Sequence, residues 1–305
     1  MADVKPQNFN PDNVLMHEAK EGVLLNNFNA PILQEVIKNS KVFQLGVAQD
    51  MTGSSEKDFT FWGDEPGAYW VGEGQKIQTT KPTLLTAKMR AHKVATIVVA
   101  SREYLNYTYS EFFNDIRPKI VEALHKKIDE AVVLGVDNPF KQSIDGVATE
   151  SGNVVDGDIT VDNVLALQDV LLEHDVEPNA FISKAQNRTK LRGLRDENNN
   201  SYYDRPSNTI DGLATVDLKS SEMAKGTLYA GDFDHLYYGI PYNISYAISE
   251  EGQLSTITNE DGSPVNLFEQ ELIALRVTMD VATLIAKDDA FAKLAPNGAE
   301  EVETI

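Results

Sequence analysis

Cysteine is absent from this chain of 305 residues, which excludes disulfides, thiolate zinc sites and a cysteine nucleophile. No apolar run approaches the roughly 20 residues that a membrane helix needs, so no membrane partner is expected. The polar N-terminal sequence MADVKPQNFNPDN lacks the apolar core of a secretory signal. Positive charge is also scarce, because 27 Lys and Arg face 47 Asp and Glu, giving a net charge of −20. A protein that binds nucleic acid independently of sequence should carry a basic footprint, and the chain as a whole has none.

Catalytic motifs are missing as well. The five histidines are scattered without HExxH spacing, and neither GxSxG nor GxxxxGK[ST] occurs. Gly72 and Gly74 could open a dinucleotide-binding loop, but Ile77 occupies the position of the third glycine. Asp232 and Asp234 stand two apart on an expected strand and would face one side, as paired acid–base carboxylates do, although surface acids at a turn are far commoner. We therefore predict no catalytic residue, no metal and no cofactor.

The strongest periodic pattern runs from Thr108 to Val136. Its apolar residues recur every three or four positions, which is typical of an amphipathic helix. A capping box would begin at Thr108, and Gly135 should end the helix. Pro118 predicts either a kink or a first helix that ends near Arg117. The apolar stripe consists of Phe113, Ile116, Ile120, Leu124, Ile128 and Ala131.

The remaining segments alternate between helix and strand patterns. We expect the first 30 residues to form an extended arm that is ordered only when another surface receives it. Asp261-Gly262 predicts a hairpin turn. The other expected helices cover 31–37, 160–176 and 183–194, and the expected strands cover 41–49, 84–100, 180–182, 209–218, 226–240, 242–249 and 268–294.

Residues 56–95 have the composition of a two-stranded ribbon joined by a glycine-rich stretch. Such a ribbon cannot bury both faces by itself, so it must rest on another surface. Composition alone favours Trp62 and Trp70 in the chain's own core. Residues 56–94 carry a net charge of +1 against −21 for the remainder, which suits contact with an acidic surface but is equally consistent with ordinary variation.

The order of these parts resembles the major capsid proteins of tailed bacteriophages, whose fold also occurs in encapsulin shells and in the floor of herpesvirus capsids. The resemblance covers the chain from about Asn8 to Leu294, and its joint order is more specific than any single motif. In many relatives Arg276 is followed closely by a second base, whereas Met279 and Asp280 stand there in this chain. The matching pieces are WVGEG at 70–74, SREYL at 101–105, the long predicted helix, DGLATVDL at 211–218, GTLYAGDFDHLYYGI at 226–240 and the closing stretch at 267–294.

The resemblance implies an α+β fold with an arm, a ribbon loop, a spine helix under a peripheral sheet, and an axial α/β domain. The implied parts are an N-terminal arm (1–39), a peripheral-domain strand (40–55), the extended ribbon loop (56–95), the spine helix and peripheral domain (96–150), the axial domain (151–265), a return to the peripheral domain (266–294) and a loose acidic tail (295–305).

The resemblance also implies a function. The chain would self-assemble as hexamers and pentamers of an icosahedral phage or prophage head, made in the host bacterial cytoplasm and matured from a procapsid. Expected partners are other copies of the chain, a portal protein and double-stranded DNA that is enclosed without sequence-specific binding. Because no long charged helical extension follows Met1, we expect a separate scaffolding protein or an extension already removed. The alternative is an encapsulin-like bacterial compartment shell.

In this family the ribbon reaches over a neighbouring subunit, which would bury its tryptophans between chains instead of in the chain's own core. We expect Lys88 and Arg90 to pair with acids of the adjacent subunit. Some relatives weld neighbours by a Lys–Asn isopeptide bond, but no residue pattern around Lys76 or Lys81 supports that chemistry here. The residues expected at the assembly interface are Trp62, Trp70, Glu73, Lys88, Arg90 and Tyr104.

Overall fold

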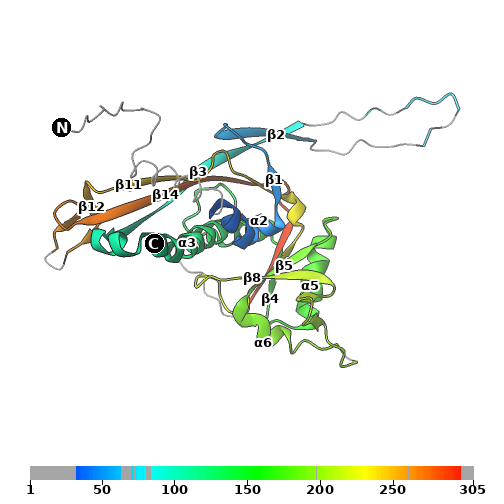
Figure 1. The fold of residues 1–305 in the computed structure, drawn as a ribbon. Helices are drawn as coiled ribbons and strands as arrows, with labels where there is room; N and C mark the ends of the chain where they lie inside the picture. The colour runs from blue at the N-terminus through cyan, green and yellow to red at the C-terminus, as the bar shows by residue number, and fades with distance from the viewer. Residues whose placement is uncertain are drawn as a thin grey trace, which may run out of the picture. The chain divides into compact units, whose positions relative to one another are not determined.

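The computed structural model describes residues 32–62, 70–71, 73–77, 79, 84–196, 198–259 and 262–296, without the side chains of 61–62, 84–85 and 103–114 (Figure 1). Most of the expected N-terminal arm and nearly all of the expected tail lie outside these residues. The chain divides into two units, which are taken in turn below. Within those residues and their gaps, the first unit spans 32–36, 95–121 and 243–278, and the second spans 37–94, 122–242 and 279–296.

The second unit contains a mixed seven-stranded sheet. In spatial order its strands are β4 (Val154–Asp156), β15 (Phe291–Ala295), β9 (Leu228–Gly231), β5 (Ala180–Lys184), β8 (Leu213–Leu218), β7 (Thr209–Ile210) and β6 (Tyr203–Asp204). Both α4 (Ile144–Glu150) and α5 (Val161–Leu172) pack against β15. Leu167 and Leu171 of α5 meet Phe181 of β5 in a fully buried core. Thr160 caps α5 by accepting from the Asn163 amide.

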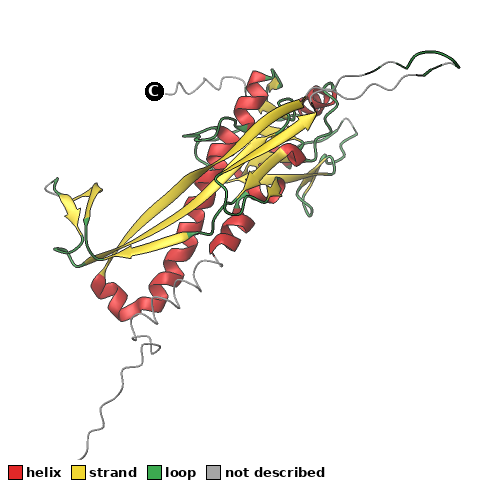
Figure 2. Ribbon diagram, turned by 90° about the horizontal axis from the view of Figure 1, so that it is seen from above, coloured by secondary structure: helices red, strands yellow, loops and turns green. Residues whose placement is uncertain are grey.

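A second sheet contains the ribbon. Its spatial order is β1 (Val47–Gln49), β10 (Leu236–Gly239), β14 (Leu272–Ile285), β3 (Leu84–Ser101) and β2 (Glu56–Trp62), with β11 (Ser245–Ser249) also paired to β14. Figure 2 shows β3 and β14 as the long strands of this sheet. The strand expected over 84–100 and the two-stranded ribbon expected within 56–95 are therefore confirmed.

The spine helix α3 runs from Arg102 to Asp129 and continues as a π-helical turn from Glu130 to Leu134. Its buried residues Ile120, Leu124, Ile128 and Ala131 confirm the predicted stripe. Gly135 ends the helix as predicted, in a left-handed conformation with φ of 75° that favours glycine.

The predicted start of this helix is wrong. It begins before Thr108 because β3 passes into α3 without a loop, and the Arg102 amide donates to the Glu271 carbonyl at 2.9 Å. A capping box at Thr108 therefore has no free helix end to cap. Pro118 lies inside α3 and does not end it, so the alternative of a first helix that ends near Arg117 is wrong.

Four other expectations need correction. The stretch expected as one strand over 268–294 is divided into β14 and β15, which belong to different sheets. Residues 41–49 are not one strand, because Lys41–Leu45 form the short helix α2 ahead of β1. The helix expected over 183–194 is reduced to a 3-10 turn at Ala185–Asn187 and α6 (Arg188–Leu191). The strand expected over 226–240 is split between the two sheets as β9 and β10 by a 3-10 turn at Phe233–His235.

The first unit contains part of α3, β11 and a hairpin of β12 (Gln253–Thr258) and β13 (Pro264–Asn266). The hairpin confirms the turn expected near Gly262, whose φ is 81°, while Asp261 lies outside the described residues. Residues 32–39 are helical, as predicted from 31–37. Glu35 of that helix forms an ion pair with Arg117 of α3. Among the described residues, no helix is long and apolar enough to cross a membrane.

Candidate assembly interface

The base of the ribbon is anchored in a small apolar cluster of the second unit. Buried Met51 and Met89 meet Ala282 and Leu284 there, and Phe59 packs against the cluster. The Phe59 ring also stacks on Tyr237 of β10, with 5.7 Å between the ring centroids. This packing attaches the base of the ribbon to the rest of its sheet.

The two strands of the ribbon carry facing opposite charges. Residue 58 stands opposite residue 88, and residue 56 stands opposite residue 90. Lys88 Nζ lies 3.6 Å from Asp58 Oδ1, and Arg90 Nε lies 2.9 Å from Glu56 Oε1. Both bases thus have a carboxylate partner within their own chain. Because all four side chains are well exposed, each pair contributes only about 0–1 kcal/mol to stability.

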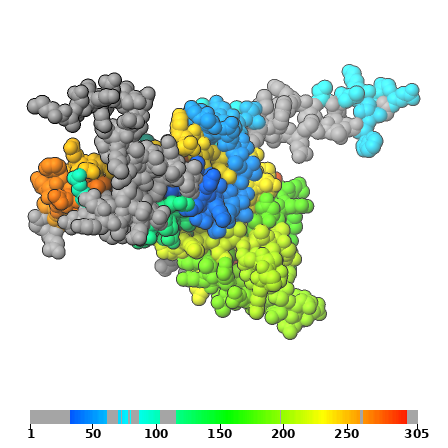
Figure 3. Space-filling model, viewed as in Figure 1, coloured from blue at the N-terminus to red at the C-terminus, as the bar shows by residue number. Residues whose placement is uncertain are grey.

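The described residues between the two ribbon strands are exposed and partly apolar. Trp70 is 105% exposed, Ile77 is 75% exposed and Val71 is 39% exposed. Glu73 lies beside them and is exposed. Figure 3 shows the described residues of this stretch, in cyan, away from the sheets of the second unit. The expectation from composition that Trp70 lies in the chain's own core is therefore wrong.

The remaining expected interface residues cannot be placed at side-chain level. Trp62 ends β2 and Tyr104 lies in the first turn of α3, but both side chains are outside the described residues. The structure thus brings Lys88 and Arg90 together on β3, places Trp70 and Glu73 beyond the ribbon strands, and leaves the position of the other two side chains open.

A buried carboxylate joins α3 to the start of α2. Asp129 is 2% exposed and accepts from the Ser40 hydroxyl at 2.6 Å, the Lys41 amide at 2.9 Å and the Val42 amide at 3.2 Å. Burial raises the pKa of Asp129 to about 6, while the hydrogen bonds from Ser40, Lys41 and Val42 act in the opposite direction. Together with the Ser40 side chain, Asp129 satisfies the free amides at the beginning of α2.

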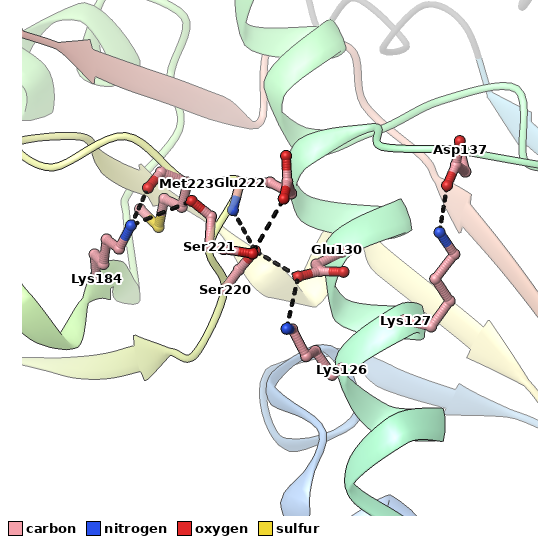
Figure 4. Close-up of polar contacts among 9 residues, drawn as sticks. All are labelled: Lys126, Lys127, Glu130, Asp137, Lys184, Ser220, Ser221, Glu222 and Met223. Atoms are coloured by element: carbon pink, nitrogen blue, oxygen red, sulfur yellow. Dashed lines mark hydrogen bonds and ion pairs between the residues drawn. The ribbon is translucent and has the colours of Figure 1, made fainter.

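A second carboxylate lies next along the chain. Glu130 stands four residues after Lys126 on the helix and is only 8% exposed. Figure 4 shows that it accepts from the Ser220 hydroxyl, at 2.6 Å, and meets Lys126 Nζ at 3.8 Å. Glu130 therefore holds the loop that follows β8. Burial also lowers the pKa of the neighbouring His125.

None of these carboxylates forms a metal or catalytic constellation. Asp232 and Asp234 do not lie side by side on a strand, because Asp232 caps the 3-10 turn by accepting from the Asp234 amide. Within the described ranges, no group of three or more His, Asp or Glu could hold a metal ion.

The sequence missed Asp129, Glu130 and Ile77. Ser40 belongs to the residue types that often cap helices, and it was the one local signal for the start of α2. Ile77 was visible as an isolated apolar residue in a polar, glycine-rich stretch. No local signal identified Asp129, because its partners lie almost 90 residues away in the chain.

The chain is similar to known proteins over most of its length. The model of the Phage capsid family matches residues 21–295. The chain belongs to the phage capsid family. The major capsid protein of Staphylococcus phage 80alpha is 55% identical over 296 residues, covering 96% of this chain and 91% of that protein. The probable major capsid protein gp17 of Mycobacterium phage L5 is 26% identical, covering 82% of each.

Solved structures show the same fold. A chain described as Mycobacterium phage Adephagia superposes with a TM-score of 0.69 at 20% identity, covering 86% of this chain and 91% of that one. A chain described as the capsid of an empty GTA particle gives a TM-score of 0.60 at 11% identity, covering 84% and 89%. The α+β capsid fold is thus confirmed. As a member of this family the chain is a major capsid protein, a structural component of the phage virion and not an enzyme.

Proposed function

We propose that the chain assembles with copies of itself into the hexamers and pentamers of an icosahedral tailed-phage head that encloses double-stranded DNA. The observation that carries the proposal is the fully exposed Trp70 beyond an anchored ribbon. An aromatic side chain buries about 150–250 Å², so removing Trp70 from water is worth at most roughly 4–6 kcal/mol at about 25 cal/mol per Å². A neighbouring copy supplies the cover that the chain itself does not provide for this side chain.

The proposed interface extends along the ribbon and to the start of the spine helix. It comprises Trp62, Trp70, Glu73, Lys88, Arg90 and Tyr104, with Lys88 and Arg90 facing acids of the neighbour as well as their own Asp58 and Glu56. The seven-part layout from arm to acidic tail is proposed with it. The resemblance to phage capsid proteins supports both the proposed interface residues and the proposed layout.

Charge shapes the proposed partners. Each copy carries −20, so copies repel one another and a shell needs apolar contacts to close. We infer that a separate scaffolding protein assists closure of the shell and that DNA enters through a portal. The same negative charge disfavours tight binding of the packaged DNA, which would be enclosed and not held.

The test is expression of the chain alone and together with a candidate scaffolding protein, followed by size-exclusion chromatography and negative-stain electron microscopy. Closed shells only on co-expression support the proposal. Regular small shells from the chain alone that carry protein cargo would instead favour a compartment shell. A monomer under both conditions would overturn assembly by this route.

A further inference from the structure

One surface of the second unit departs from the acidic character of the chain. Residues 184–195 contain five bases and no acid, and residues 219–226 contain two bases and one acid. These two segments together carry +6, which leaves −26 on the rest of the chain. The bases are Lys184, Arg188, Lys190, Arg192, Arg195, Lys219 and Lys225. The two segments are called the basic surface below.

Hydrogen bonds hold the two segments of the basic surface together. Lys184 Nζ donates to the carbonyls of Ser221 and Met223, as Figure 4 shows. The buried Asn187 donates from Nδ2 to the Thr227 carbonyl at 2.9 Å and accepts from the Gly226 amide at 2.9 Å. Gly226 and Thr227 are therefore held beside Asn187, so Lys225 lies close to the start of α6.

Several of these bases lack a carboxylate partner. Arg188 pairs with Asp217 and Lys190 pairs with Asp158. Within the described residues, no ion pair is formed by Arg192, Lys219 or Lys225, although each is exposed. The basic surface thus keeps an uncompensated positive charge in a strongly negative protein.

Pro296, the last described residue, lies beside this surface. Pro296 follows β15, and a Cβ atom placed on Gly226 would lie 3.1 Å from the Pro296 Cβ atom. On the other side of β15, residue 295 stands opposite the exposed acid Asp156. The exit is therefore bordered by an acid on the β4 side and by Lys225 on the β9 side.

The residues that follow are acidic. Residues 297–305 read NGAEEVETI and include Glu300, Glu301 and Glu303 without any base. Glu300, Glu301 and Glu303 stand four, five and seven residues after Pro296, so at 3.3–3.6 Å per extended residue they can reach up to about 14, 18 and 25 Å from it. Repulsion from Asp156 and attraction to Lys225 both direct them toward the basic surface.

We propose that residues 297–305 dock on the basic surface of their own chain, with Glu300 and Glu301 facing Lys225 and Arg192. A single exposed ion pair contributes little, but several charges in one network contribute more, and their strength falls with added salt. Docking also covers a positive patch that would otherwise attract other polyanions to the subunit. The inference stands on the charges and the exit geometry and does not depend on the proposed assembly.

A zero-length carbodiimide tests the docking, because it forms an amide only between a carboxylate and an amine already in contact. The full chain in its monomeric fraction is treated at 50 mM and at 1 M NaCl, and the yield of Lys225 crosslinked to Glu300 or Glu301 is measured by mass spectrometry. We expect this crosslink at low salt and a loss of several-fold at 1 M, where the screening length falls to about 3 Å.

Nearness to the exit could give some crosslinking without docking, so charge variants decide the question. Arg192→Glu removes a base of the surface but leaves Lys225 in place, while Lys141→Glu makes the same charge change elsewhere on the unit. Docking predicts a several-fold lower yield in the Arg192 variant alone. Equal yields in both variants overturn the proposal, and so do crosslinks that join labelled to unlabelled chains in an isotope-mixed sample.

Discussion

Asp129 is a buried carboxylate whose ionisation destabilises the folded state. Its folded pKa of about 6 lies above the ordinary value of 3.8, so the folded state holds the proton more tightly than the unfolded state does. The resulting contribution to stability is complete below the unfolded pKa and is lost as the pH rises through about 6. A chain that carries −20 thus has one carboxylate whose ionisation weakens its own fold.

The first prediction concerns Asp129→Asn, which keeps the shape of the side chain but removes its titration. Between pH 5 and pH 7.5 the wild-type free energy of unfolding should fall relative to the variant by about 1 kcal/mol, since one pKa unit corresponds to about 1.4 kcal/mol. Urea unfolding of the monomer at several pH values measures the difference.

Asp137→Asn is the matched control, because Asp137 is exposed and pairs with Lys127. That pairing lowers the pKa of Asp137, so its titration lies below the measured window. Its φ of 47° is one that asparagine tolerates. Parallel stability curves for wild type and Asp129→Asn would contradict the prediction.

Among the helices and strands, the features that depend on local interactions were predicted from local sequence patterns. The stripe of α3, its end at Gly135 and both ribbon strands were all readable from the sequence. The segment Lys41–Leu45 was not readable, since its strand-like composition is overridden by Ser40 and the distant Asp129. Likewise, the break between β9 and β10 depends on their membership of different sheets, which no local pattern encodes.

The candidate interface was predictable to a similar degree. Two facing strands of opposite charge in β2 and β3 follow from the sequence once the register is known, but the register itself does not. The exposure of Trp70 depends on whether another part of the chain covers it. Composition alone predicted that it would be covered, and this was wrong. The family resemblance supplied that information because it encodes an arrangement between chains.

The second prediction tests the ribbon as an element. Lys88→Glu with Arg90→Glu should leave folded monomers but abolish shells, because acids would then face both the chain's own acids and those of the neighbour. Shells are scored by negative-stain electron microscopy, and folding of the monomer by circular dichroism.

A four-residue exchange separates the two kinds of partner. Adding Glu56→Arg and Asp58→Lys to the same variant restores both pairs within the chain and keeps the ribbon's net charge. If the bases act on a neighbour, the exchange still yields no shells. Recovery of shells would show that the pairs act only within one ribbon, and the proposed contact with neighbouring acids would be wrong.

The third prediction belongs to the whole molecule. Trp70→Ala should change the free energy of unfolding of the monomer by no more than about 0.5 kcal/mol, as for other exposed positions. Assembly should weaken by at least about 2 kcal/mol per contact, roughly a 30-fold loss of affinity, if Trp70 is an interface anchor. Light scattering against protein concentration measures the shift.

Trp70→Phe provides the control, because it keeps an aromatic side chain at the same place. It should assemble at a concentration between those of wild type and Trp70→Ala. Equal assembly of all three proteins would remove Trp70 from the interface, while a destabilised Trp70→Ala monomer would mean that the side chain has a role within its own chain.

The division of the chain has a consequence for how such genes recombine. The polypeptide passes between the two units five times, and four of these passages lie inside a helix or strand, namely the helix at 32–39, β3, α3 and β14. A single crossover between two capsid genes therefore cannot exchange one unit without also carrying part of the other. Hybrid genes should survive where the parental sequences are already compatible across these elements, so the coding region behaves as one block of inheritance.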